Sequence, residues 1–204
     1  MKALSKIPLI LLCLAMFMVS CDKEEDFIEP EKSYKLAEVR WTLAEGDGEE
    51  TFTVEVPEKQ YLNESAQDML ISFNPLDEIP GKSEFFTSNS TLFSQLNQQE
   101  DSISIPTMTE ILSDGYGYLS GGPQVPFQLG EYTFDLNTSI QNSTELTPHT
   151  KMTYSAKVYL KKITASYIAR FVEEGTHNYQ EIEGKWTGTF FKSIDSNTVW
   201  EEIK

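Results

Sequence analysis

The sequence predicts an all-β protein whose long, mostly antiparallel strands form an elongated, twisted sheet. Several segments alternate apolar and polar residues with a period of two, which is typical of strands buried on one face. Segments rich in Gly, Pro and Asn separate them, as expected for turns. Only 108–112 has a helical pattern, and it is about one turn long. A compact β-sandwich is the alternative architecture.

The first twenty residues have the three parts of a secretion signal. Lys2 and Lys6 form a basic region, and 7–19 is an apolar run too short to span a bilayer as a helix. Small residues then precede the cysteine in Met18-Val19-Ser20-Cys21, which resembles the lipobox of bacterial lipoproteins. The resemblance implies that residues 1–20 are removed as a signal peptide. It also implies that fatty acyl chains on Cys21 anchor the protein permanently in a membrane.

Residues 21–35 are predicted to form a disordered tether between the lipid and the domain. Charged residues and Pro30 dominate its sequence, and apolar periodicity is almost absent. The cluster of Lys23 with acidic neighbours at 22–26 resembles the surface-export signal of some Gram-negative lipoproteins. It implies an anchor in the cell outer membrane with the domain facing the medium. An anchor facing the periplasm is the alternative.

Composition excludes several classes of function for the single domain predicted over 36–204. The formal net charge of −16 repels phosphate backbones, so nucleic acid is not expected as a partner. Cys13 and Cys21 are the two cysteines, and both precede the domain, which excludes disulfides and thiolate sites from it. His149 and His177 lie beside turn residues and are expected to be exposed rather than bound to a metal. No nucleophile–base pair, glycine-rich phosphate loop or catalytic carboxylate pair is recognisable, so we expect no catalysis, cofactor or metal.

The predicted strands are rich in Val, Ile, Thr, Tyr and Phe, the residues that suit a pleated, half-buried surface. They cover 51–56, 132–140, 152–161, 165–172, 186–194 and 198–203. The run 151–172 is predicted to be two neighbouring strands of about ten residues, joined at 161–164. Such strands are about twice the usual length, which favours an elongated sheet over a sandwich.

Four short motifs occur in a characteristic order along the domain. They are Tyr61-Leu62-Asn63-Glu64-Ser65, Ile105-Pro106, Thr147-Pro148-His149-Thr150-Lys151 and Gly184-Lys185-Trp186-Thr187-Gly188. Together they resemble landmarks of the aerolysin-like proteins, in particular the epsilon-toxin and mosquitocidal-toxin branch, from about residue 61 onward. The resemblance implies a pore-forming fold. Several copies would associate as a homo-oligomer, and each would contribute an amphipathic β-hairpin to a membrane-spanning barrel.

The best match to such an insertion hairpin pairs 85–93 with 102–105, with its tip at 95–101. Its large apolar side chains are Phe85, Phe86, Leu92, Phe93, Ile103 and Ile105. The segment departs from the family pattern, because few apolar groups face one side, Pro106 removes a ladder donor, and Glu100 and Asp101 would have to cross the bilayer. Residues 33–60 are also too few for a separate receptor-binding lobe. A relative that binds or assembles without lysing membranes is therefore an open alternative.

A second class of function is a glycan- or protein-binding β-sandwich lipoprotein in surface uptake or adhesion. Its candidate ligand contacts are Trp41, near the tether, and Tyr116 and Tyr118, in a glycine-rich loop. Trp186 and Trp200 lie in strand patterns and are expected to be buried. The acidic loop 45–50 has the chemistry of a calcium ligand but lacks the spacing of a calcium loop.

Overall fold

The computed structural model describes residues 32–99, 101–112, 117–119, 121–136, 140 and 142–203. Lys32–Lys204 forms one compact unit. Cys21, the predicted signal and most of the predicted tether lie outside the described residues. Strand β1 begins at Tyr34, just inside the end predicted for the tether.

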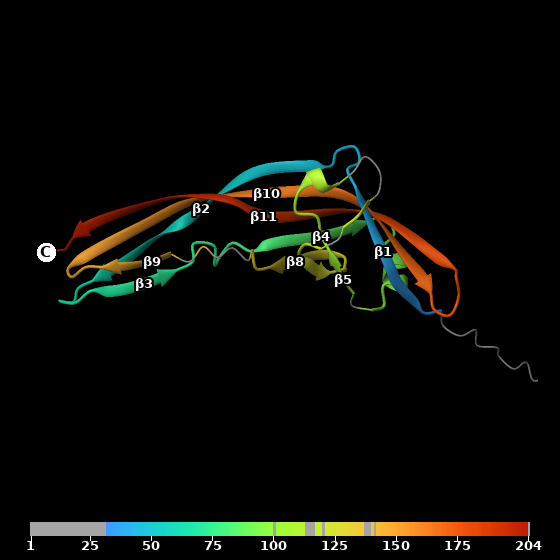
Figure 1. Ribbon diagram of the computed structural model, residues 1–204, viewed down its shortest axis with the longest axis horizontal. Coiled ribbons are helices and arrows are strands. Elements are labelled where there is room, and N and C mark those ends of the chain that lie inside the picture. The colour runs from blue at the N-terminus through green and yellow to red at the C-terminus, as the bar shows by residue number, and fades with distance from the viewer. Residues whose placement is uncertain are drawn as a thin grey trace, which may run out of the picture. The chain divides into compact units, whose positions relative to one another are not determined.

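A hairpin of two very long strands forms the spine of this unit. Strands β10 (Thr150–Glu173) and β11 (Tyr179–Glu202) have 24 residues each. They pair antiparallel from Thr150↔Glu202 to Val172↔Tyr179, with one bulge after Tyr159. At the usual rise per residue each strand is about 80 Å long. Figure 1 shows the pair as the two longest arrows, with the other strands arranged beside them. The predicted elongated antiparallel sheet is confirmed.

Strands β1, β2 and β4 pair directly with the two edges of this hairpin, and the named strands all pair antiparallel. The seven-stranded sheet has the order β6-β1-β10-β11-β4-β8, and β2 also pairs with β10. Its further strands are β1 (Tyr34–Thr42), β2 (Gly48–Asn63), β4 (Gly81–Thr87), β6 (Gly117–Tyr118) and β8 (Gly130–Phe134). Two small sheets pair β3 (Met69–Phe73) with β9 (Asn142–Leu146) and β5 (Ser102–Ser104) with β7 (Gln124–Pro126). The helical elements among the described residues are α2 (Ser90–Leu96) and the one-turn 3-10 helix at Thr109–Ile111.

Strand β10 buries opposite faces in its two halves. In its first half the buried side chains are at even positions, from Met152 to Leu160. In its second half the fully buried series is at odd positions, from Ile163 to Phe171. Because successive side chains point to opposite faces of a strand, the change of parity moves burial from one face to the other.

Two separate hydrophobic cores result from this switch. The large core packs against the second half of β10 and includes Trp41, Phe85, Phe127, Tyr167 and Trp186. The small core packs against the first half and includes Val56, Ile71, Leu146, Met152 and Tyr154. The β3–β9 sheet covers the small core, at the end of the hairpin where the C-terminus lies in Figure 1.

The prediction of two strands joined at 161–164 is wrong, because β10 is continuous through these residues. Lys161 to Thr164 pair without interruption with β11 on one side and β2 on the other. The break in the apolar pattern at Lys161 and Lys162 marks the change of buried face and not a turn. The two sides of the hairpin are therefore β10 and β11, which meet at the turn 174–178.

The Gly184–Gly188 motif permits dense aromatic packing in the large core. A Cβ at Gly184 would collide with the carbonyl oxygen of Phe86 and the ring of Tyr167, and one at Gly188 with the ring of Trp186. Trp186 is fully buried, as predicted, and its Nε1 donates a hydrogen bond of 2.8 Å to Ser83 Oγ. Glycine is needed here because the strand passes directly against neighbouring rings and backbone.

Candidate functional site

The residues of the predicted insertion hairpin belong to several different elements. Phe85 lies in β4, which pairs with β11 and β8, and Phe93 lies in helix α2. Ile103 lies in β5, which pairs with β7. The predicted pairing of 85–93 with 102–105 is therefore wrong for this folded state.

Most of these side chains are core residues. Phe85, Phe93, Ile103 and Ile105 are buried in the large core, and Leu92 packs against it. Phe86 alone among the six is largely exposed, at 45%. Pro106 is also buried, at the end of the small β5–β7 sheet.

The helix at 90–96 has local causes that the strand prediction overlooked. Asn89 caps it, since its Oδ1 accepts a hydrogen bond of 3.0 Å from the backbone N–H of Leu92. Phe93 and Leu96, three residues apart, then place two apolar side chains on one helical face. An Asn cap followed by this spacing was the signal available in the sequence.

Of the aromatic residues predicted to contact ligand, Trp41 is buried in the large core. Trp41 is 1% exposed, and its ring meets that of Trp186 edge to face at 5.4 Å between centroids. Trp41, predicted as a ligand contact, is instead a core residue, because β1 joins the main sheet and turns this side chain into the large core. Tyr116 lies outside the described residues. The backbone of Tyr118 pairs with that of Arg40.

The β3–β9 sheet is attached to the long hairpin by side chains. Its described backbone ladder joins β3 only to β9, from Met69↔Leu146 to Phe73↔Asn142. Ile71 and Leu146 are buried in the small core beneath it, whereas Leu70 on the opposite face is 75% exposed. The sheet is thus amphipathic and rests on the small core by its apolar face.

Asn63 ties this sheet to the end of β2. Its side chain is buried, and its Nδ2 donates to the carbonyl oxygens of Leu146 at 2.7 Å, Gln67 at 2.8 Å and Thr147 at 3.1 Å. Its Oδ1 accepts hydrogen bonds from the backbone N–H and the hydroxyl of Ser65. The motifs at 61–65 and 147–151, far apart in sequence, therefore meet through one amide.

Two long strand edges are unpaired at this end of the hairpin. In the described part of the chain, β2 pairs only with β10, and β11 pairs with β4 only as far as Thr189. The outer edges of β2 and of 190–202 thus carry backbone donors and acceptors without ladder partners. Such edges are templates for pairing with another chain.

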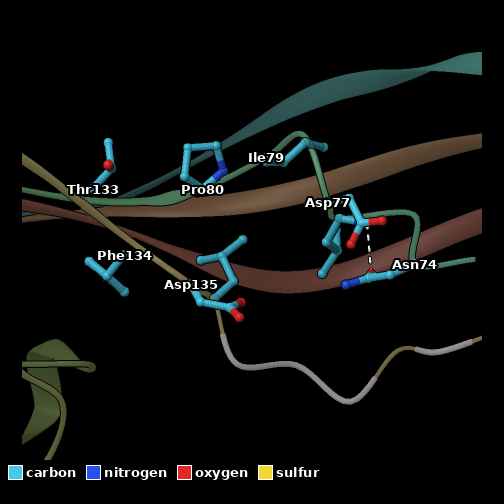
Figure 2. Close-up of a pocket in the computed structure, with 9 residues that line it drawn as sticks. Asn74, Asp77, Ile79, Pro80, Thr133, Phe134 and Asp135 are labelled. Atoms are coloured by element: carbon cyan, nitrogen blue, oxygen red, sulfur yellow. Dashed lines mark hydrogen bonds between the residues drawn. The ribbon is translucent and has the colours of Figure 1, made fainter.

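A small cavity marks the place where the chain passes between the two cores. It has a volume of about 320 Å³ and is lined by residues of the β3–β4 connection and of the end of β8. Figure 2 shows Asn74 and Asp77 on one side of it and Phe134 and Asp135 on the other. The Oδ1 of Asn74 accepts a hydrogen bond of 2.9 Å from the N–H of Leu76, which fixes the turn. The cavity lies at the junction between the cores, and no described Lys, Arg, His or Cys side chain lines it.

The acidic loop between β1 and β2 uses its central carboxylate for structure. Asp47 Oδ2 accepts hydrogen bonds from Ser166 Oγ at 2.7 Å and from the N–H of Ala44 at 2.9 Å, and Oδ1 accepts one from Lys185. Burial alone would raise the pKa of Asp47, but these hydrogen bonds and the charge of Lys185 hold the pKa below its ordinary value. The carboxylate is therefore already satisfied without a calcium ion.

The two histidines cannot share a metal ion. His149 is in the turn before β10, with a positive φ of 53°, and His177 is in the turn after it. Both are exposed, as predicted, and the length of β10 separates them. Among the described residues, no group of three or more His, Cys, Asp or Glu side chains is placed to hold a metal. No helix in the described ranges is long and apolar enough to span a bilayer.

No protein-family model matches the chain, and the search of curated proteins finds no significant match. Solved structures do match it. A lamprey immune protein is 13% identical, with a TM-score of 0.41 over 83% of this chain and 54% of that protein, so the chain spans about half of its length. The parasporin-2 toxin of Bacillus thuringiensis, described as recognising cancer cells, is 9% identical, with a TM-score of 0.33 over 83% of this chain and 75% of that one.

An aerolysin-like protein of Bombina maxima is also 9% identical, with a TM-score of 0.31 over 83% of this chain and 97% of that one. Structural neighbours of the aerolysin-like kind, which the four sequence motifs predict, are therefore found. These TM-scores all lie below 0.5.

The Asn63 contacts predict that Asn63→Ala lowers the free energy of unfolding by about 1–3 kcal/mol, because buried carbonyls lose their donors. Amide exchange should become faster in β3 and β9 than in β10. Asn63→Asp should be similarly destabilising, since it keeps the acceptor for Ser65 and loses the donor to Leu146 and Thr147. Denaturant unfolding and hydrogen exchange measure these effects, with exposed Asn197→Ala as control. Equal unfolding midpoints for Asn63→Ala and the control would show that the hydrogen bonds of Asn63 do not stabilise the fold.

The Asp47 contacts predict an acid-dependent contribution to stability. A carboxylate whose folded pKa is lowered stabilises the fold fully above its unfolded pKa, near 3.8, and this contribution is lost as pH falls through the folded pKa. Asp47→Asn should lower the free energy of unfolding by about 1–3 kcal/mol at neutral pH and by progressively less in acid. Urea unfolding across this range measures the effect, with exposed Asp195→Asn as control. If the free energies of unfolding of wild type and Asp47→Asn differ by the same amount at all pH values, the stabilising role of the Asp47 carboxylate is refuted.

Proposed function

We propose that this chain is a non-enzymatic, lipid-anchored envelope protein that associates with further copies of itself through the free edges of β2 and β11. Its long paired strands relate it to pore-forming proteins, and we place it among their non-lytic relatives. The anchor is Cys21, and the membrane is the outer membrane with the domain facing the medium.

The free edge of β11 is the main structural support for association between copies. Between Ser193 and Trp200 its only charged residue is Asp195, so little charge opposes the approach of a second strand. The edge of β2 is better protected, because it has Pro57 and several charged side chains, which are Glu49, Glu50, Glu55, Glu58 and Lys59. β11 is therefore the edge from which association starts.

The direction of the strands limits how copies can pair. β2 and β11 both run antiparallel to β10, so they run parallel to each other. Pairing β11 of one copy with β2 of the next would be parallel and would continue into a ring or filament. Pairing two β11 edges about a twofold axis would be antiparallel and would stop at a dimer.

Membrane insertion by the predicted hairpin segment would be costly in this fold. Removing Phe85, Phe93, Ile103 and Ile105 from the large core forfeits about 6–12 kcal/mol of burial. That is comparable to the whole stability of a typical domain, about 5–15 kcal/mol. The β3–β9 sheet is held less firmly, but its strands of 5 residues are about half the length needed to cross a bilayer. These magnitudes favour assembly without lysis.

The lipid anchor predicts that Cys21→Ser abolishes incorporation of a labelled fatty acid and moves the chain out of the membrane fraction. The physical reason is that the other cysteine, Cys13, lies within the segment expected to be removed. Cys13→Ser is the matched control and should keep both the label and the membrane location. If the wild-type chain incorporates no labelled fatty acid, the proposal of a lipid anchor at Cys21 is wrong.

Edge-to-edge association predicts that Asn197→Glu with Val199→Glu weakens self-association at least about tenfold, because the new charges oppose both a second β11 edge and the acidic β2 edge. Sedimentation of the Cys21→Ser chain over a range of concentrations measures it. The matched control is Ser155→Glu with Thr153→Glu, the cross-strand partners of these positions on the central strand. A wild-type chain that is monomeric at every concentration would exclude the proposal.

Non-lytic assembly predicts that the intact chain releases no dye from lipid vesicles and forms no membrane-spanning rings in electron micrographs. The reason is that the predicted hairpin segment cannot leave the large core without a large loss of burial, and that β3 and β9 are too short to cross a bilayer. Limited proteolysis before the assay tests whether removal of a restraining segment changes this. Dye release by the intact chain would establish the lytic alternative.

A further inference from the structure

A groove beside the β3–β9 sheet has the chemistry of a ligand site. It lies between β9 and the C-terminal part of β11 and has a volume of about 280 Å³. We call it the Trp200 groove, and its lining residues are Phe73, Asn142, Ser143, Thr144, Met152, Tyr154, Ser196, Thr198 and Trp200. The volume is just below the usual range for small-molecule pockets, about 300–1,000 Å³.

Trp200 is the main exposed aromatic surface of the groove. It pairs across the ladder with Met152 and lies on the same face, yet it is 46% exposed, contrary to the predicted burial. Trp41 and Trp186 are both buried in the large core. A large, rigid ring that remains half open beside a groove can contact a flat apolar face of a ligand.

The polar lining is neutral. Asn142, Ser143, Thr144, Ser196 and Thr198 contribute hydroxyl and amide groups, and none of the nine lining residues carries a charge at neutral pH. The groove is therefore an uncharged patch in a chain with a formal net charge of −16. Without a basic side chain the groove does not suit an anion, and its hydroxyls and amide would lose hydrogen bonds beneath a purely apolar ligand.

One residue in the lining of the groove, Tyr154, has a buried hydroxyl without a partner among the described residues. Tyr154 is 2% exposed, and its Oη makes no hydrogen bond in the described part of the chain. Its ring meets that of Phe73 edge to face at 4.7 Å between centroids, which fixes its position in the lining. An unpartnered buried hydroxyl is unfavourable until a donor or acceptor reaches it, directly or through a water molecule.

We propose that the Trp200 groove binds a neutral saccharide, either a free sugar or the terminal unit of a glycan. The C–H face of the sugar ring packs on Trp200, and its hydroxyls exchange hydrogen bonds with the Ser, Thr and Asn side chains. A ligand hydroxyl also completes the hydrogen bonding of Tyr154. The groove is separate from the free outer edge of β2, and binding does not require association of copies.

The test is titration of the full mature chain with glucose, galactose, mannose, N-acetylglucosamine and their disaccharides, with glucuronate as the charged comparison. Tryptophan fluorescence should report binding mainly through Trp200, because Trp41 and Trp186 are buried. An array of immobilised neutral glycans, run beside the titration, distinguishes a glycan terminus from a free sugar. A fluorescence change with at least one neutral saccharide and none with glucuronate is expected.

Variants locate the site. Trp200→Ala should weaken binding at least about tenfold and Trp200→Phe less, whereas exposed Tyr179→Ala at the opposite end of β11 should have no effect. Tyr154→Phe should also weaken binding while leaving the unfolding midpoint unchanged or higher, since it removes an unpaired buried group. That combination separates a ligand contact from a merely structural role.

Several results would overturn the proposal. They are the absence of any response to neutral saccharides at millimolar concentration, tighter binding of glucuronate, and equal affinity of Trp200→Ala and wild type. Occupation of the groove by an extended peptide or a fatty acid in place of a sugar, detected as the same fluorescence change with those probes alone, would also overturn it.

Discussion

Pairing of β10 with β11 determines where every other strand of the main sheet can lie. β1 and β2 share the second edge of β10, and β4 takes the outer edge of β11 as far as Thr189. The antiparallel ladder satisfies the backbone groups on the facing edges of both long strands over almost their whole length, so one hairpin contributes to both cores.

The change of buried face along β10 gives the two ends of the hairpin different properties. The large core is surrounded by β1, β4, β8 and α2, and its aromatic rings interlock. The small core is covered on one side by a two-stranded sheet that Asn63 holds in place. Free edges and the Trp200 groove occur at this second end. The free strand edges and the groove therefore lie at the small-core end, where fewer strands cover the hairpin.

Local patterns in the sequence predicted the strand class and most strand positions, because half-buried strands leave a period-two signature in any context. They could not identify the continuous β10, since a change of buried face and a turn both interrupt the apolar alternation. For a related reason, Trp41, a predicted ligand contact, is buried, and Trp200, which the strand pattern predicts to be buried, is half exposed. Whether a strand residue is covered depends on which distant segments pack on that face. Asn63 stood out as part of a motif, but its hydrogen bonds to Leu146 and Thr147 depend on contacts across more than 80 positions.

The position of β1 has a mechanical consequence. The chain enters the domain at Tyr34, which pairs with Glu173, while Met152 and the Trp200 groove lie about 70 Å away along β10. If Cys21 is held in a membrane and the groove is held by a ligand, tension runs along the strands and perpendicular to the hydrogen bonds between β1 and β10. All the hydrogen bonds of the β1–β10 ladder are then loaded in shear at the same time, and they do not open one after another.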